Sequence, residues 1–278
     1  MKTYLDKNVY EAALERIAYC FQEFDNVLVA FSGGKDSGVL LNLCYNYADE
    51  HGLLDKLTMY HLDYEAQYQM TTEYVTRTFL EQFPGIRKMW YCVPIKAQSA
   101  CALGEPYWTP WDAAKKKLWV RAMPENPYVV HEGNLDVPFR HGMVDYEFQD
   151  KLSRHFAKKR GTTAVMVGLR ADESLNRYAA VARGKKRRSY EGRKWITQTS
   201  AVTANVYPLY DWRVSDIWTA TARFGFDYNR LYDLLYQAGL TAGQMRVASP
   251  FNDCAQESLK LYKVIDPSNW ARMKIERA

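Results

Sequence analysis

A glycine-rich turn between an apolar strand and a helix is the feature that most limits how this chain can fold. Residues 27–31 are wholly apolar, which is typical of a parallel strand covered on both faces. The run Ser32-Gly33-Gly34-Lys35-Asp36-Ser37 follows directly, and an apolar helical pattern begins at Val39. Glycines allow a tight turn and close approach of a ligand, and a helix start offers unpaired N–H groups to an anion. This combination predicts a phosphate-binding loop in an α/β protein.

The polar side chains of the turn support that prediction. The hydroxyls of Ser32 and Ser37 and the ammonium of Lys35 can all donate to a bound anion. Asp36 would repel a phosphate, so we expect it to cap the helix or to hold a Mg²⁺ that bridges the phosphates. The turn is not a Walker A loop, because Asp36 stands where that motif has Ser or Thr after the lysine. A tight turn with a serine cap is the simpler structural alternative.

Strand-like and helix-like segments alternate along most of the chain. Apolar runs predict further strands at 57–62, 87–93, 163–168 and 202–207, and helical spacing predicts helices at 8–23, 69–82, 146–160, 214–224 and 229–238. Such alternation predicts a doubly wound parallel sheet with helices on both faces, a Rossmann-like α/β fold. Ligands of these sheets bind beyond the carboxyl ends of the strands. The stretch 94–140 has no regular pattern. We expect one nucleotide-binding domain at 1–239 and a small C-terminal appendage at 240–278.

Composition excludes several classes of protein. Of 278 residues, 47% are hydrophobic and 25% charged, the balance of a globular protein with a sizeable core. The N-terminus lacks the apolar core of a signal peptide, and the chain has no apolar window of about 20 residues that could span a membrane. We therefore expect a cytoplasmic protein. The five cysteines include no C-x-x-C pair, so we expect neither a zinc site nor an iron–sulfur cluster.

A second group of charged residues follows the strand expected at 163–168. The run Gly168-Leu169-Arg170-Ala171-Asp172-Glu173-Ser174-Leu175-Asn176-Arg177 places two arginines and a glutamate at a strand's carboxyl end. Such side chains are costly inside a core but suit the recognition of phosphates and sugars. The structural alternative is a solvated helix start with local Arg–Glu pairs.

Together these motifs resemble one known family. The turn at 32–37 resembles the PP-loop of the N-type ATP pyrophosphatases and of the phosphoadenosine phosphosulfate (PAPS) reductases. G-x-R-x-x-E-S-x-x-R at 168–177 is similar to the second signature of the PAPS reductases, and Pro208-Leu209-Tyr210-Asp211-Trp212 with Asp216-Ile217-Trp218 is similar to the third. Tyr228-Asn229-Arg230-Leu231-Tyr232 resembles the element after that. The resemblance runs from about 27 to 238 and implies a fold of the adenine nucleotide alpha-hydrolase type.

The resemblance also implies roles for individual residues. Lys35, Asp36, Arg170 and Arg177 would act on the reacting phosphates, with Asp36 as a Mg²⁺ ligand. The ligand would be ATP or PAPS. The implied nucleotide-binding set comprises Ser32, Gly33, Gly34, Lys35, Asp36 and Ser37 around the phosphates, Asp63 and the Gly168 backbone at the adenosine, and Arg170, Glu173, Ser174 and Arg177 on the substrate side.

The chain departs from the reductases at the thiol. A PAPS reductase carries a nucleophilic cysteine near its C-terminus, whereas residues 255–278 here contain none, and Cys254 stands in a different context. We therefore favour a protein that cleaves the α–β phosphate bond of ATP to adenylylate, or transfer sulfur to, an unknown substrate. A thioredoxin-dependent PAPS reductase that uses Cys254 is one alternative. A nucleotide-sensing, nucleic-acid-associated regulator without turnover is the other.

Partners are suggested by two further patterns. Residues 183–194 are rich in Arg and Lys, as is Lys115-Lys116-Lys117; the first stretch is a solvated loop, a nucleic-acid contact with Tyr190 and Trp195 for stacking, or a lid over the nucleotide. The stretches 63–68, 106–112 and 245–247 resemble PAPS-reductase-like proteins grouped with the co-regulator IbrA, which implies a ParB-like partner. The oligomeric state stays open, and a homodimer is compatible with the sequence.

Overall fold

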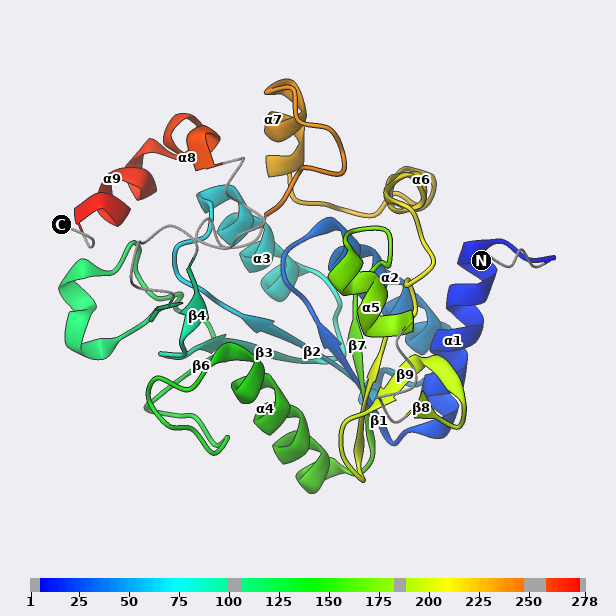
Figure 1. Ribbon diagram of the computed structural model, residues 1–278. Coiled ribbons are helices and arrows are strands. Elements are labelled where there is room, and N and C mark those ends of the chain that lie inside the picture. Colours follow the sequence, from blue (N-terminus) through cyan, green and yellow to red (C-terminus); the bar gives the residue numbers. More distant parts are fainter. Residues whose placement is uncertain (1–5, 100–106, 183–188, 248–258, 276–278) are drawn as a thin grey trace.

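An eight-stranded, mostly parallel sheet forms the centre of the protein (Figure 1). The computed structural model describes residues 6–99, 107–182, 189–247 and 259–275. The strand order is β6-β3-β2-β1-β7-β10-β9-β8. The strands are β1 (Asn26–Ala30), β2 (Leu57–Leu62), β3 (Arg87–Cys92), β6 (Val129–His131), β7 (Thr163–Val167), β8 (Ser189–Tyr190), β9 (Arg193–Gln198) and β10 (Thr203–Val206). A separate two-stranded sheet joins β4 (Ala97–Gln98) to β5 (Tyr107–Trp108).

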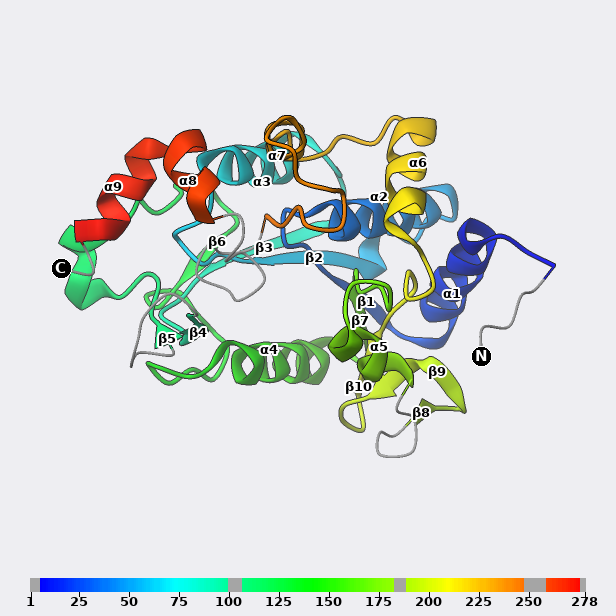
Figure 2. The same ribbon diagram turned by 45° about the horizontal axis from the view of Figure 1, so that its top comes forward.

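Helices cover both faces of the central sheet, as Figure 2 shows. One face carries α1 (Val9–Glu23), α2 (Lys35–Glu50), α3 (Gln69–Glu81) and α6 (Val214–Phe224), and the other carries α4 (Asp145–Arg160) and α5 (Leu175–Ala182). Three further helices lie outside the layers that cover the sheet: α7 (Leu231–Gln237), α8 (Leu259–Ile265) and α9 (Pro267–Ile275). The described residues also form two short 3₁₀ helices, η1 (Leu54–Lys56) and η2 (Ala113–Leu118). The predicted α/β Rossmann-like fold is confirmed.

The central strand shows why apolar runs predicted buried strands. Val27 and Val29 of β1 pack into the core beneath α1 and α2, whereas Leu28 packs on the opposite face with Phe148 and Leu152 of α4. All four residues from Asn26 to Val29 are buried. A strand that is covered on both faces needs apolar side chains at every position, which is the pattern at 27–31.

The sheet differs from the prediction at its two edges. The pairing of β10 with β9 and of β9 with β8 is antiparallel, so the sheet is not wholly parallel. Residues 193–198 are half-exposed or exposed except for Ile196, which leaves an edge strand without the apolar run that marks a central one. At the other edge, β6 forms within the stretch 94–140, for which the sequence predicts no regular element.

The C-terminal helices pack onto the rest of the described chain. Tyr262 of α8 and Met273 of α9 are buried in one apolar cluster with Tyr68, Val120 and Leu231. The Tyr262 hydroxyl also donates a hydrogen bond of 3.0 Å to the carbonyl of Gln67. Across the described residues, we find no helix with the length and apolar character needed to span a bilayer.

Candidate functional site

The two predicted charged motifs meet at the switch point of the sheet. From β1 the chain builds the sheet outward through β2, β3 and β6, and then returns to place β7 on the other side of β1. The neighbouring strands β1 and β7 are parallel, with Ala30 opposite Val167. Their carboxyl ends lead into 32–37 and 168–177, so both motifs lie at the edge of the sheet where proteins of this type bind ligands.

Hydrogen bonds within the loop hold its serines together. The hydroxyls of Ser32 and Ser37 lie 2.9 Å apart, and Ser37 Oγ also accepts a bond from the Ser32 N–H at 3.1 Å. Gly33 has a φ of +76°, a left-handed conformation that favours glycine. Gly34 is the N-cap of α2 and provides no side-chain cap. The first backbone N–H groups of α2 are therefore available to a ligand or to another part of the chain.

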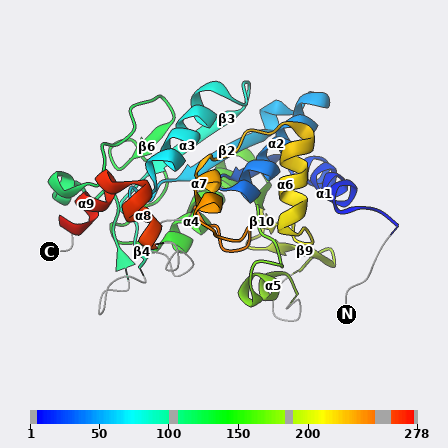
Figure 3. The same ribbon diagram turned by 90° about the horizontal axis from the view of Figure 1, so that it is seen from above.

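A tyrosine from α7 takes one of these donors. The N–H of Lys35 donates to the Tyr232 hydroxyl at 3.1 Å, and the Lys35 ammonium lies 5.3 Å from the centre of the same ring. The side-chain amide of Asn229 donates to the Gly33 carbonyl at 3.2 Å. In all three views α7 lies between α3 and α6, as is clearest in Figure 3. Thus α7 and the turn before it cover the loop, a role that the resemblance at 228–232 did not reveal.

Asp36 sits between two cations. One carboxylate oxygen pairs with the Lys35 ammonium at 3.1 Å, and the other pairs with the guanidinium of Arg170. All three residues are at least nine-tenths buried. The ion pair with Arg170 joins the start of α2 to the end of β7, and so connects the two motifs directly.

The same geometry bears on the expected Mg²⁺. Both Asp36 oxygens already face a positive group, so a divalent cation placed there would be repelled by two neighbours. Among the described residues, no three His, Cys, Asp or Glu side chains are grouped to hold a metal. The side chains as arranged do not fit a Mg²⁺ held by Asp36, and no step below depends on one.

Gly168 lies against the start of α2. A Cβ added at Gly168 would come within 2.9 Å of the Asp36 carbonyl carbon and of the Ser37 nitrogen. Contacts that short to backbone atoms cannot be relieved by moving a side chain. The absence of a side chain at 168 is therefore needed for β7 and α2 to pack this closely.

Glu173 of the second motif lies between the two arginines. Glu173 lies 3.9 Å from Arg170 and 3.7 Å from Arg177. Ser174 accepts a hydrogen bond of 3.2 Å from the Arg177 N–H at the start of α5. The Arg177 side chain is half-exposed, whereas that of Arg170 is only 2% exposed. Arg177 is thus the arginine of this motif that can reach a ligand without breaking a buried ion pair.

Asp63 is tied into the interior at the end of β2. Its carboxylate accepts bonds from the Trp90 indole at 2.7 Å and from Arg121 at 2.6 Å. Burial alone would raise the pKa of Asp63, but the charge of Arg121 and these bonds hold it below its usual range. The Asp63 carboxylate is therefore ionised and engaged within the protein, so the expected contact with adenosine would fall to other atoms of this turn.

Glu65 fastens the 107–121 segment to the same turn. Its carboxylate accepts the N–H of Trp111 at 2.7 Å and the N–H of Val120 at 2.6 Å, and its own φ is +60°. Neither this buried glutamate nor Arg121 was predicted. The run Asp63-Tyr64-Glu65 after a strand was the only sequence signal for the cluster.

The third signature serves the framework. Asp211 forms a two-pronged ion pair with Arg16 of α1, with N–O distances of 2.6 and 2.7 Å. The Trp212 indole donates to the Val9 carbonyl at 2.9 Å, and the Tyr210 carbonyl accepts the Ala171 N–H at 2.8 Å. The signature therefore anchors α1 and the second motif.

Three cysteines can be placed, and none suits nucleophilic chemistry. Cys20, Cys44 and Cys92 are buried and unpaired, and desolvation raises the pKa of each thiol above its ordinary value. Cys101 and Cys254 lie outside the described residues. So do residues 183–188 of the basic stretch, of which the strand pair at 189–194 is described.

Comparison with protein families divides the chain into two matched segments. The model of the phosphoadenosine phosphosulfate reductase domain matches residues 26–238. A domain of unknown function, DUF3440, matches residues 239–278. The uncharacterized protein YbdN of Escherichia coli (strain K12) is 35% identical over 272 residues, which make up 97% of this chain and 65% of that relative.

Several solved structures align with this chain at low sequence identity. A PAPS reductase from Candida auris, in a phosphate complex, is 14% identical with a TM-score of 0.43, covering 84% of this chain and 93% of its own. An FMN adenylyltransferase from Candida glabrata, solved with FMN and AMPCPP, is 14% identical with a TM-score of 0.45, covering 84% and 63%. The U34-tRNA thiolase NcsA from Methanococcus maripaludis is 11% identical with a TM-score of 0.38, covering 99% and 81%.

Proposed function

Since this chain belongs to the family of the phosphoadenosine phosphosulfate reductase domain, we propose that it binds an adenine nucleotide, ATP in preference to PAPS, at the crevice between β1 and β7. It then cleaves the α–β phosphate bond and passes the adenylyl group, or sulfur through an adenylylated intermediate, to an acceptor. The chain spans 65% of the length of the curated relative that it matches. The activity of the whole protein, its acceptor and a ParB-like partner are therefore proposals too.

The observation that carries this proposal is the meeting of the two motifs. The N-terminus of α2 offers backbone donors beside the Ser32 and Ser37 hydroxyls, and Arg170 reaches it from β7. Arg177 adds a half-exposed cation on the same side. Donors and cations that are fixed before a polyphosphate arrives can stabilise the charge that develops on its oxygens.

The proposed reaction needs little covalent help from the protein. An acceptor oxygen forms a bond to the α-phosphorus, and the bond from that phosphorus to the α–β bridging oxygen breaks. Pyrophosphate leaves with the bonding electrons, and the proton of the acceptor passes to solvent. Positioning and charge neutralisation provide most of the acceleration in such transfers, which suits a site built from N–H groups, hydroxyls and arginines.

The cysteines support ATP activation over sulfate reduction. A reductase needs an accessible thiolate, and the three described thiols are buried with raised pKa values. A PAPS reductase that uses Cys254 stays the second candidate. It predicts thioredoxin-dependent sulfite release from PAPS, and full activity of Cys254→Ala would eliminate that role.

Pyrophosphate release from ATP is the experiment that tests the proposal. Calorimetry with ATP, AMP and PAPS would first identify the preferred nucleotide, and a coupled pyrophosphate assay would follow turnover with candidate acceptors. Ser37→Ala removes a hydroxyl from the loop and should abolish both signals, whereas Ser215→Ala removes an exposed hydroxyl on α6 and should change neither. Failure of ATP to bind at millimolar concentration would refute the proposal. Nucleotide binding without turnover would favour the regulatory alternative.

A further inference from the structure

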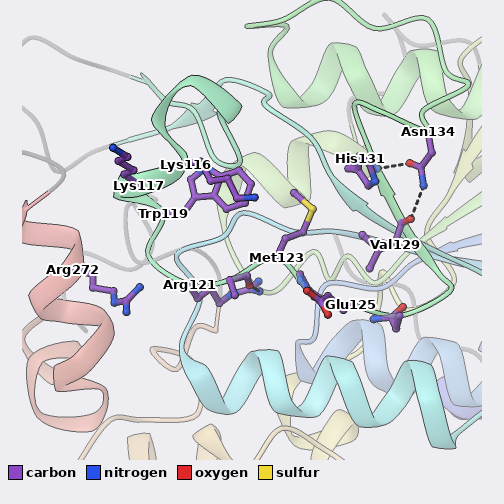
Figure 4. A pocket seen from close by; sticks show the side chains of 13 residues that line it. Lys116, Lys117, Trp119, Arg121, Met123, Glu125, Val129, His131, Asn134 and Arg272 are labelled. Carbon is purple, nitrogen blue, oxygen red and sulfur yellow. Dashed lines mark hydrogen bonds between the residues drawn. The ribbon is translucent and has the colours of Figure 1, made fainter.

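A hollow lined by cations lies apart from the proposed nucleotide site. It has a volume of about 590 Å³ and is formed by the segment 116–134 and by Arg272 of α9 (Figure 4). None of its lining residues belongs to the loop at 32–37 or to the motif at 168–177. This hollow is therefore a separate candidate binding site.

Positive charge in the hollow is largely uncompensated. Lys116, Lys117 and Arg272 are exposed, and within the described part of the chain none of them forms an ion pair with a carboxylate. Glu125 is the single acid among the lining residues. Arg121 also lines the hollow, but its charge is balanced by Asp63. Three cations with no carboxylate partner among the described residues, placed around a concave surface, attract a ligand with more than one negative group.

An aromatic ring of fixed orientation stands among these cations. The Trp119 indole donates a hydrogen bond of 2.9 Å to the Asp112 carbonyl, and its ring meets that of Trp111 edge-on at 5.2 Å. The Lys116 ammonium lies 5.6 Å from the centre of the Trp119 ring. Lys116 thus lies over a face of this ring, so a flat base that stacked there would displace the ammonium to the side, where it could pair with the phosphate of that base.

Polar groups complete the opposite wall. The Nδ1 atom of His131 accepts a hydrogen bond of 3.1 Å from the Gly133 N–H, so the neutral ring carries its proton on Nε2 as a donor. Asn134 holds the His131 backbone in place through a bond of 2.7 Å, and its amide donates to the Val129 carbonyl at 3.1 Å. Figure 4 shows these side chains facing the same hollow as Met123 and Trp119.

We propose that this hollow binds single-stranded nucleic acid, with phosphates at Lys116, Lys117 and Arg272 and a base on Trp119. The cations come from two elements, η2 and α9, which suits phosphates that repeat along a strand. A single strand exposes the faces of its bases to aromatic rings, whereas a duplex keeps them stacked inside. The site goes beyond the proposed nucleotide chemistry and uses none of the residues assigned to it.

Salt-dependent binding of short oligonucleotides tests this site. Fluorescence anisotropy would follow labelled 12-nucleotide oligo(U) and oligo(dT) between 50 and 200 mM salt, with UMP as competitor. The double variant Lys117→Ala/Arg272→Ala removes two phosphate contacts. It should bind on the order of tenfold more weakly at 100 mM salt, and its plot of log K against log salt should be shallower by about 1.4.

Matched variants separate this site from the alternatives. Lys260→Ala/Lys263→Ala removes two exposed charges from α8, outside the hollow, and should leave affinity and slope unchanged. Lys194→Ala tests the basic stretch in the same way. Absence of oligonucleotide binding at 50 mM salt would overturn the proposal. So would unchanged affinity in Lys117→Ala/Arg272→Ala, or an equal loss of affinity in Lys260→Ala/Lys263→Ala. Competition by UMP as strong as that by the unlabelled oligonucleotide would also overturn it. The ATP affinity of Lys117→Ala/Arg272→Ala, measured by calorimetry, should equal that of the wild type. The oligonucleotide site and the nucleotide site can therefore be tested independently.

Discussion

The backbone N–H of Lys35 donates a hydrogen bond of 3.1 Å to the phenolic oxygen of Tyr232. This donor is one of the unpaired N–H groups at the start of α2, where an anion would bind. Tyr232 is buried, and desolvation raises the pKa of its hydroxyl above the ordinary value, so the phenol stays neutral. A phosphate that uses the Lys35 N–H must therefore displace the hydroxyl of α7.

Tyr232→Phe tests that competition. The substitution keeps the buried ring but leaves the Lys35 N–H without its partner, which costs about 1–3 kcal/mol of unfolding free energy. A phosphate would restore the missing bond without displacing a hydroxyl, so ATP should bind more tightly than to the wild type, by about fivefold for each 1 kcal/mol of that cost that binding recovers. Urea unfolding and calorimetry would measure the two effects.

The control for this change is a tyrosine on the same helix. Tyr236 is 72% exposed, and Tyr236→Phe should alter neither stability nor nucleotide affinity. If Tyr232→Phe weakened ATP binding severalfold, the hydroxyl would have to contact the nucleotide instead of competing with it.

Gly168→Ala should separate the two motifs. The new Cβ would lie 2.9 Å from backbone atoms of Asp36 and Ser37, so either β7 or the start of α2 must move. Overpacking of this kind costs typically 1–3 kcal/mol, and the displaced loop should lose most of its ATP affinity. Gly243→Ala is the matched control, because nothing lies within 4 Å of a Cβ there. Wild-type binding by Gly168→Ala would contradict the close packing of β7 on the loop.

Alanine substitutions of the two arginines of the second motif should have different effects, one on stability and the other on activity. Arg170→Ala leaves the buried Asp36 with Lys35 alone, and breaking a buried ion pair costs about 3–5 kcal/mol. Arg177→Ala removes a half-exposed side chain, with a stability loss of about 0–1 kcal/mol. If Arg177 acts on the phosphates, pyrophosphate release should fall at unchanged stability. Equal unfolding free energies for both variants, measured in urea, would contradict the framework role of Arg170.

The buried strand at 27–31 and the glycine turn after it could be predicted, because each is determined by consecutive residues. The apolar run at 27–31 is buried on both faces, and the glycine turn after it has the left-handed φ at Gly33. Both features are readable from consecutive residues. The edge hairpin of β8 and β9 was missed because an edge strand needs no continuous apolar run.

The contacts around the loop could not be predicted, because they join distant residues. The sequence predicts that Lys35 donates to a bound anion and that Asp36 caps the helix or holds Mg²⁺. In the structure both residues are buried, Asp36 against Arg170 and Lys35 against Tyr232. The pairing of Asp63 with Arg121 likewise depends on how the 107–121 segment folds back over β2. No spacing in the sequence encodes these distances, so the motifs indicated the site but not which of its groups are already engaged.

A buried histidine beside the loop should make the fold sensitive to mild acid. His61 on β2 lies 2.8 Å from the Phe31 carbonyl through Nδ1, next to the start of the loop. Burial lowers its pKa below the ordinary 6.5, although the nearby Asp63 opposes the shift. The folded state therefore binds fewer protons than the unfolded state as the pH falls below 6.5, and the unfolding free energy must decrease there. The loss between pH 6.5 and 5.5 is at most about 1.4 kcal/mol.

Urea unfolding at pH 7.5 and 5.5 would measure that loss. His61→Gln keeps a donor for the Phe31 carbonyl but cannot titrate, so its unfolding free energy should depend less on pH than that of the wild type. His141→Gln makes the same substitution at a largely exposed position and serves as the control. Asp63 does not titrate in this pH range. Burial raises its pKa, but Arg121 holds that pKa below 3.8, so the stability that its ionised form contributes is lost only at lower pH. The same pH dependence in wild type and His61→Gln would show that another group drives the acid response.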